Sequence, residues 1–145
     1  MKVVVSGIGF SAAHFAIVGG VREPLHGHNY EVEASVQGRP GKEGMVVDFR
    51  ELRRLLRQAI APLDHKLLLP KKSRAVSARL KGGEVEVIAC GERFVFPQSD
   101  VVFLPISAVT AEQLARFLHD KIKGKVGGRL SIRVFESPHA SAVYP

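Results

Sequence analysis

The chain has little of what marks secreted or membrane-bound proteins. It contains one cysteine, Cys90, among 145 residues, so no disulfide can form within one chain. No apolar run reaches the roughly 18 residues that suggest a membrane helix. The amino terminus reads as a strand and lacks the apolar core of a secretory signal. These absences predict a soluble protein of the reducing cytoplasm that has no membrane partner.

Negative charge is also scarce: 14 Asp and Glu stand against 21 Lys and Arg, which gives a formal net charge of +7. Such an excess attracts nucleic acid, an acidic membrane surface or a small anionic substrate. No stacking aromatics are interleaved with the basic residues, as a single-strand nucleic-acid platform requires. We interpret most of these cations as a solvated surface, and nucleic acid stays a weak alternative partner. The two basic groups are Arg50, Arg53, Arg54, Arg57, and Lys71, Lys72, Arg74.

The length suits one compact domain over residues 1–145. Alternating apolar residues predict a strand over 2–15, broken or bulged near Gly7 and Gly9, and a second strand over 27–38. A turn-rich loop over 17–24 separates them. Two final strands are expected over 129–136 and 141–144, and no internal repeat is evident.

Helical periodicity predicts two helices. Asp48 caps the first, which Pro62 ends, and Thr110 caps the second, which Gly124 closes. Between them, residues 76–80, 84–89 and 93–96 have strand-like composition, with Gly82-Gly83 as a hairpin turn. The expected buried positions of the helices are Phe49, Leu52, Leu55, Leu56, Ile60, and Leu114, Ala115, Phe117, Leu118, Ile122.

Three histidines, His14, His26 and His28, stand where a strand protein would hold a metal ion. Residues two apart on a strand share a face and lie roughly 6.6 Å apart along it, so His26 and His28 can converge on one ion. His14 on a neighbouring strand would leave a fourth position open, as in catalytic zinc sites. His-x-His alone is weak evidence, because such a pair often merely shares a solvent-facing side. Imidazole ligands favour Zn²⁺ over Mg²⁺ or Ca²⁺ and leave iron and nickel open.

The sequence around these histidines resembles one enzyme family. Residues 10–15 read FSAAHF and residues 25–30 read LHGHNY, and further matches are VVDF at 46–49, LDHK at 63–66 and TAE at 110–112. Together they resemble the 6-pyruvoyl-tetrahydropterin synthase and 6-carboxy-tetrahydropterin synthase family. The resemblance implies an α+β T-fold: an antiparallel four-stranded sheet with two helices on one face. It also implies an inserted β-hairpin at about 70–104, and trimers that stack as hexamers.

The resemblance implies roles for the matching residues. The three histidines would hold Zn²⁺ for a dihydropterin substrate. Glu136 would anchor the pterin ring, because a carboxylate accepts two parallel hydrogen bonds from an aminopyrimidinone edge. Thr110 would contact the ring or act only as the helix cap.

Asp64 and His65 resemble the family's proton-relay pair, since histidine changes its charge near neutral pH. Adjacent strand residues point in opposite directions, so the pair requires a turn, or Asp64 orients a histidine of another subunit. The plainer alternative is a cap after Pro62. Cys90 lies in a hairpin turn far from the histidines, and we do not expect it to be a nucleophile.

The family's usual catalytic cysteine is missing beside the histidines, and Glu23 stands there instead. A free glutamate is a weak base toward carbon. Burial raises the pKa of a carboxylate and so makes it a stronger base, whereas the neighbouring Arg22 would oppose that rise. The string REPLHGH at 22–28 resembles a subgroup in which glutamate replaces the cysteine. That subgroup cleaves the side chain of dihydroneopterin derivatives to give 6-hydroxymethyl-7,8-dihydropterin.

We therefore expect a zinc-dependent lyase acting on 7,8-dihydroneopterin or its phosphates. The basic surface slightly favours a phosphorylated substrate. Two other products stay open, 6-pyruvoyl-tetrahydropterin and 6-carboxy-tetrahydropterin, although both reactions usually use the cysteine. A non-catalytic zinc- and pterin-binding oligomer is the second alternative.

Overall fold

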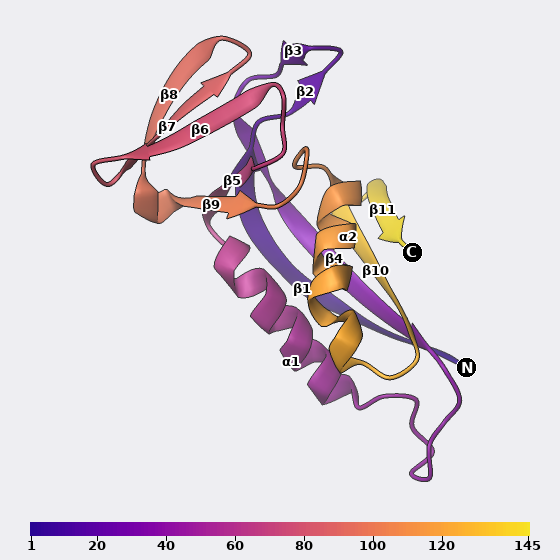
Figure 1. Ribbon diagram of the computed structural model, residues 1–145. Coiled ribbons are helices and arrows are strands. Elements are labelled where there is room, and N and C mark those ends of the chain that lie inside the picture. The colour runs from indigo at the N-terminus through magenta and orange to yellow at the C-terminus, as the bar shows by residue number, and fades with distance from the viewer.

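The computed structural model describes residues 1–145, which form a six-stranded sheet covered on one face by two helices (Figure 1). The order of its strands is β11-β10-β4-β1-β5-β9. No helix is long and apolar enough to cross a membrane. The strands of this sheet are β1 (Lys2–His14), β4 (His26–Gln37), β5 (Lys66–Pro70), β9 (Val101–Leu104), β10 (Arg129–Ser137) and β11 (Ala140–Tyr144).

The expected four-stranded antiparallel sheet is present as β11-β10-β4-β1, and the α+β T-fold expectation is confirmed. Two short parallel strands, β5 and β9, extend the sheet beyond β1. They were not predicted, because the residues of 67–69 are apolar and buried without alternation. A strand covered on both sides loses the period-two pattern that reveals half-buried strands. The expected irregularity of β1 is a register shift between Val5 and Ile8, where Gly7 has a φ of 71°.

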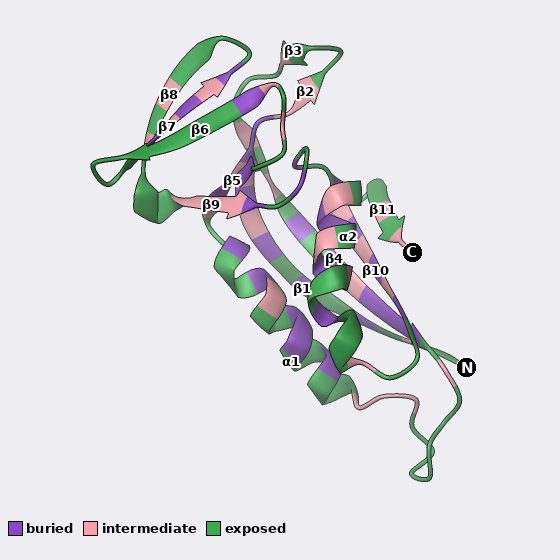
Figure 2. Ribbon diagram, viewed as in Figure 1, coloured by how far each residue is buried: buried purple, intermediate pink, exposed green.

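Helices α1 (Phe49–Ile60) and α2 (Ala111–Ile122) begin at the two predicted caps. The Asp48 carboxylate accepts a hydrogen bond from a backbone N–H of the first turn of α1, and the Thr110 hydroxyl does the same for α2. Helix α1 packs against β1, and α2 packs against β10 and β11, while the outward helix faces are exposed (Figure 2). The buried residues of both helices join those of the sheet in one core. Phe49, an apolar position of the first predicted helix, is 52% exposed, and Phe117, expected in the buried stripe of the second, is only partly buried. The four arginines of α1 are exposed, as expected of a solvated face.

Residues 76–97 form a separate antiparallel sheet of three strands, β6 (Val76–Lys81), β7 (Glu84–Ala89) and β8 (Glu92–Pro97). The predicted turn joins β6 to β7, with φ angles of 61° at Gly82 and 82° at Gly83. The region expected as a hairpin is therefore a three-stranded meander, and residues 101–104 leave it to join the main sheet. Its apolar face buries a second, smaller core against Phe15, Leu67 and Leu69 of the main body.

The loop expected over 17–24 contains a short hairpin of β2 (Ile17–Val18) and β3 (Val21–Arg22). Its turn residues, Gly19 and Gly20, have φ angles of 59° and 82°. Strands of two residues are too short to produce an alternating pattern, which is why only the turn was visible in the sequence. This hairpin leads directly to Glu23.

Position 27, between two of the histidines, has no room for a side chain because β4 and β1 lie close together there. A Cβ atom at this position would lie 2.5 Å from the backbone oxygen of Ala12. We expect Gly27→Ala to force the strands apart and to lower the free energy of unfolding by about 1–3 kcal/mol. Chemical denaturation measures this change. Gly124→Ala is the matched control, because a Cβ there meets nothing within 4 Å; equal stability of the two variants would contradict the prediction.

Candidate metal centre and active site

Three histidine rings converge where β1 and β4 end side by side. In the antiparallel register, His14 pairs with His26, and Ala12 pairs with His28. The ring centroids are 4.9 Å apart for His14 and His26, 5.1 Å for His14 and His28, and 5.0 Å for His26 and His28. One ring nitrogen from each histidine lies within 4.8 Å of the others. The three residues singled out in the sequence therefore form a group that could hold a metal ion.

Backbone carbonyls fix the orientation of two of these rings. The Nδ1 atom of His14 lies 2.8 Å from the Val109 carbonyl oxygen, and that of His26 lies 2.8 Å from the Pro24 carbonyl oxygen. A carbonyl only accepts, so each Nδ1 carries the hydrogen and each Nε2 keeps a free lone pair. The Nε2 of His14 is buried without a hydrogen-bond partner. Burial lowers the pKa of His14, and the Val109 carbonyl opposes this effect; the neutral form that binds metals is favoured.

The third ring, His28, lies beside a carboxylate. Its Nε2 is 3.0 Å from Oε1 of Glu136, but the contact lacks hydrogen-bond geometry and the nitrogen is buried without a partner. Next along β4, Tyr30 has a buried hydroxyl with no hydrogen-bond partner. Burial raises the pKa of Tyr30, so its phenol is neutral. Glu136 therefore stands at the edge of the histidine group, as a ring anchor near a metal would require.

A cavity of about 650 Å³ opens in front of the histidines. Its polar lining includes most of the residues predicted from the sequence, and Phe15, Ile17 and Val109 supply part of an apolar wall. A pocket with an apolar wall and a few convergent polar groups suits a small ring-shaped ligand. The predicted site residues among its lining are His14, His26, His28, Glu23, Glu136 and Thr110.

Glu23 is next to the histidines but open to solvent. Its Oε2 lies 4.0 Å from Nε2 of His26, and its side chain is 53% exposed. Its backbone N–H donates to the Ala16 carbonyl oxygen at 2.9 Å, which ties the end of the β2–β3 hairpin to the end of β1. The carboxylate can therefore reach a ligand that lies on the histidines.

Asp64 and His65 form the expected pair, but they do not line this cavity. Oδ2 of Asp64 is 3.0 Å from Nδ1 of His65, and the required turn is provided by His65 itself, whose φ is 57°. The Ser11 backbone N–H donates to Oδ1 of Asp64 and lowers the pKa of that carboxyl. His65 has an 81% exposed side chain and lines a different hollow, next to Ser11 and Asn29. Within one chain, the pair is thus separate from Glu23.

Sequence reasoning gave no role to two charged residues that line the histidine cavity, Arg74 and Glu112. Glu112 stands in the first turn of α2, where its own backbone N–H and the Thr110 hydroxyl lower its pKa. Its place in the TAE match was the available signal. Arg74 comes from the segment before β6, and no local pattern distinguishes it from other surface cations.

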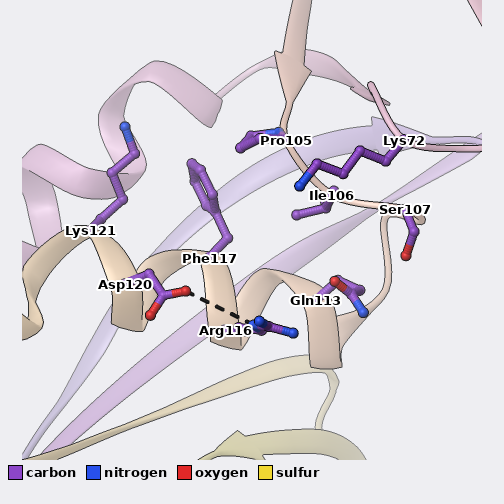
Figure 3. A pocket seen from close by; sticks show the side chains of 9 residues that line it. All are labelled: Lys72, Pro105, Ile106, Ser107, Gln113, Arg116, Phe117, Asp120 and Lys121. Atoms are coloured by element: carbon purple, nitrogen blue, oxygen red, sulfur yellow. Dashed lines mark ion pairs between the residues drawn. The ribbon is translucent and has the colours of Figure 1, made fainter.

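A third hollow, of about 470 Å³, lies between α2 and the segment that precedes it (Figure 3). Arg116 and Asp120 form an ion pair of 4.0 Å across one turn of this helix. None of the residues predicted as site residues lines it. This hollow is therefore separate from the histidine group, whereas His28 lines both the histidine cavity and the hollow that holds His65.

Comparison with known proteins supports the family resemblance seen in the sequence. The family model described as 6-pyruvoyl tetrahydropterin synthase matches residues 4–145. A putative 6-carboxy-5,6,7,8-tetrahydropterin synthase of Methanocaldococcus jannaschii is 31% identical over 122 residues, covering 83% of this chain and 75% of the relative. Its counterpart in Pyrococcus abyssi is 32% identical over 121 residues, covering 81% of this chain and 72% of the relative.

Among solved structures, the chain is similar to 6-pyruvoyltetrahydropterin synthase of Plasmodium vivax, in a catalytic-residue mutant that replaces a glutamate by alanine. The TM-score is 0.91 at 27% identity, and the match covers 99% of this chain and 96% of the other. The family resemblance and the enzyme class predicted from the sequence are thereby confirmed. The chain belongs to the 6-pyruvoyl tetrahydropterin synthase family of tetrahydropterin-forming lyases.

Proposed function

We propose that this protein is a zinc-dependent lyase that cleaves the side chain of 7,8-dihydroneopterin, or of a phosphate of it, to 6-hydroxymethyl-7,8-dihydropterin. The observation that carries the proposal is the carboxylate of Glu23 beside the three-histidine group, in a chain whose only cysteine, Cys90, is outside the cavity. The similar Plasmodium vivax enzyme also has a glutamate as catalytic residue. A cysteine-based reaction has no candidate nucleophile in this cavity.

His14, His26 and His28 would hold the Zn²⁺ through ring nitrogens, and the buried, unpartnered Nε2 of His14 fits that role. Three imidazoles leave a fourth position for a substrate oxygen. Bound zinc would polarise that oxygen and stabilise the negative charge that develops on it. The Val109 and Pro24 carbonyls hold two of the rings in the tautomer that this ligation requires.

In the proposed step, Glu23 takes the proton from the hydroxyl on the second side-chain carbon, which is the far end of the carbon–carbon bond to be cleaved. That oxygen becomes the carbonyl of the leaving aldehyde, and the carbon–carbon bond breaks. Its electron pair moves into the carbon–nitrogen double bond of the dihydropterin ring. Protonation of the remaining side-chain carbon then completes the hydroxymethyl product. Glu136 would hold the ring by its aminopyrimidinone edge, with Thr110 beside it.

We infer that the proton donor comes from another subunit. Asp64 and His65 form an ordered carboxylate–imidazole pair, yet the His65 side chain is 81% exposed and is not among the residues that line its own chain's histidine cavity. In a closed symmetric oligomer, such as the proposed trimer-based hexamer, one subunit's pair would serve a neighbour's cavity. This arrangement would also cover the exposed side of Glu23.

A phosphorylated substrate is supported by Arg74. Its side chain belongs to the lining of the same cavity, and guanidinium groups bind phosphate oxygens in pairs.

The alternative product is 6-carboxy-tetrahydropterin, which the names of the archaeal relatives favour. Family membership speaks against the purely binding alternative. Mass analysis of the pterin products separates these possibilities.

The metal assignment predicts that His28→Ala weakens zinc binding at least about 100-fold, because one of three protein ligands is lost. The measurement is bound zinc per subunit after dialysis against a chelator. His139→Ala is the matched control, since His139 is exposed and outside the histidine group. Unchanged zinc in the His28 variant would refute the assignment.

The base assignment predicts that Glu23→Gln keeps zinc and pterin binding but lowers kcat by about 10²–10⁴-fold. The amide has nearly the shape of the carboxylate but cannot accept the proton. Zinc-loaded protein is incubated with dihydroneopterin and with its mono- and triphosphates, and products are identified by mass. Full turnover by the variant would place the base elsewhere, and no new pterin from the unmodified protein would refute the enzymatic proposal.

A shared site predicts complementation between two inactive variants. Hexamers mixed equally from Glu23→Gln and His65→Ala subunits should recover about a quarter of the normal activity, because each intact residue is present at a site half of the time. The assay is turnover after co-expression or subunit exchange. Absence of recovery in verified mixed oligomers would mean that both residues act within one chain.

A further inference from the structure

We propose that the β6–β8 sheet is a brace for the catalytic loop: Glu92 of the sheet holds Arg22, and Arg22 holds Glu23 in position. The inference rests on the proposed role of Glu23 as base. Figure 1 shows the β2–β3 hairpin beside the β6–β8 sheet at the end of the molecule away from the amino terminus. The proposed brace gives a function to the β6–β8 sheet, which supplies no metal ligand and no catalytic group.

Arg22 links the two parts through its guanidinium group. Nη1 donates to the backbone oxygen of Glu23 at 2.7 Å, and Nη2 forms an ion pair with Oε2 of Glu92 at the start of β8. The guanidinium also lies 5.1 Å from the centre of the Phe94 ring. The Arg22 side chain is only 15% exposed, whereas the Glu92 side chain is 61% exposed, so the carboxylate reaches the largely buried guanidinium from the solvent side. A largely buried cation held by a carboxylate, a carbonyl and an aromatic ring has little freedom to move.

A second contact lies at the turn of the hairpin. The Cys90 thiol in the β7–β8 turn is 3.6 Å from the backbone oxygen of Gly20, close enough for a weak S–H hydrogen bond. The brace therefore meets the hairpin at its turn and at its exit. Cys90, which has no catalytic role here, contributes through this contact.

The hairpin needs such support because it has almost none of its own. Its two strands have two residues each, and Val18 and Val21 are 67% and 70% exposed. The β6–β8 sheet, by contrast, is fixed to the main body through the second core, where Phe94 and Phe96 pack on Phe15. The second core thus fixes Phe94 and Glu92, these two residues hold Arg22, and Arg22 holds the backbone of Glu23.

The same contacts compensate the positive charge of Arg22. The sequence puts a cation directly beside the proposed base, where it would weaken proton abstraction. In the structure, the guanidinium is turned to the backbone oxygen of Glu23 and to the carboxylate of Glu92. Glu92 therefore both balances the charge of Arg22 and directs it away from the reacting carboxylate.

The brace itself is tested by hydrogen exchange in the zinc-loaded protein. In Arg22→Ala, the backbone N–H of Glu23, which donates to Ala16, should exchange at least about tenfold faster, with a smaller increase in Glu92→Gln, whose amide oxygen still accepts from Arg22. Arg79→Ala is the matched control: it removes an ion pair with Glu86 inside the same sheet, away from the hairpin. Unchanged exchange in both brace variants would overturn the brace, whatever happens to turnover.

The positioning role is tested by steady-state kinetics on the same proteins. Arg22→Ala should lower kcat by about 10- to 100-fold, with a much smaller effect on KM, because a misplaced base affects the reaction more than binding. Glu92→Gln should lose less, since its amide oxygen still accepts from Arg22. Arg79→Ala should keep the normal kcat. In a Glu23→Gln background, Arg22→Ala should cause no further loss.

The outcomes separate the brace from the base. Faster exchange with normal kcat in Arg22→Ala would overturn the positioning role. A further loss of kcat in the Glu23→Gln background would also overturn it, since Arg22 would then act by another route. If Glu23→Gln turns over normally while exchange still rises in the brace variants, the base assignment fails and the brace alone is supported.

Discussion

The antiparallel pairing of β1 with β4 is the constraint on which the rest of the molecule depends. Its register sets His14 opposite His26 and leaves His28 two residues farther along the same face. The same face carries the apolar residues that pack under α1 and α2. A shift of one residue would turn the histidines away from the cavity and expose the core residues of β4. Core formation and histidine convergence are therefore consequences of one register.

The second support of the site comes from α2 and the segment before it. Val109 is buried, and its carbonyl orients His14, while Thr110 caps the helix immediately afterwards. Packing of α2 on the sheet thus fixes a backbone oxygen that selects the tautomer of a ring on β1. Glu136 at the end of β10 then approaches His28 because β10 pairs with β4 along most of its length. The segment before α2 and the end of β10 thus converge on the histidines of β1 and β4.

The remaining predicted site residues, Glu23, Asp64 and His65, lie outside the long strands of the sheet. Glu23 follows a minimal hairpin, and its closest support is the Arg22–Glu92 contact with the β6–β8 sheet. Asp64 accepts a hydrogen bond from the Ser11 backbone N–H, and its partner His65 lines another hollow. If Glu23 is the base and the Asp64–His65 pair is the proton relay, as proposed, the two groups meet only when subunits assemble. In that proposal the chemistry depends on assembly, whereas the fold of each chain does not.

The sequence by itself determined the two caps, the strands of the antiparallel sheet, the Gly82-Gly83 turn and the three converging histidines. Each of these depends on local spacing or on residues that share a face, which a linear pattern records. Tertiary structure alone decided the parallel strands β5 and β9: β5 is buried without alternation, and β9 is a strand of only four residues. It alone also decided that Arg74 and Glu112 line the cavity, that Asp64 and His65 do not, and that Glu92 meets Arg22. Those relations join residues far apart in the chain, and no local pattern encodes the packing that brings them together or keeps them apart.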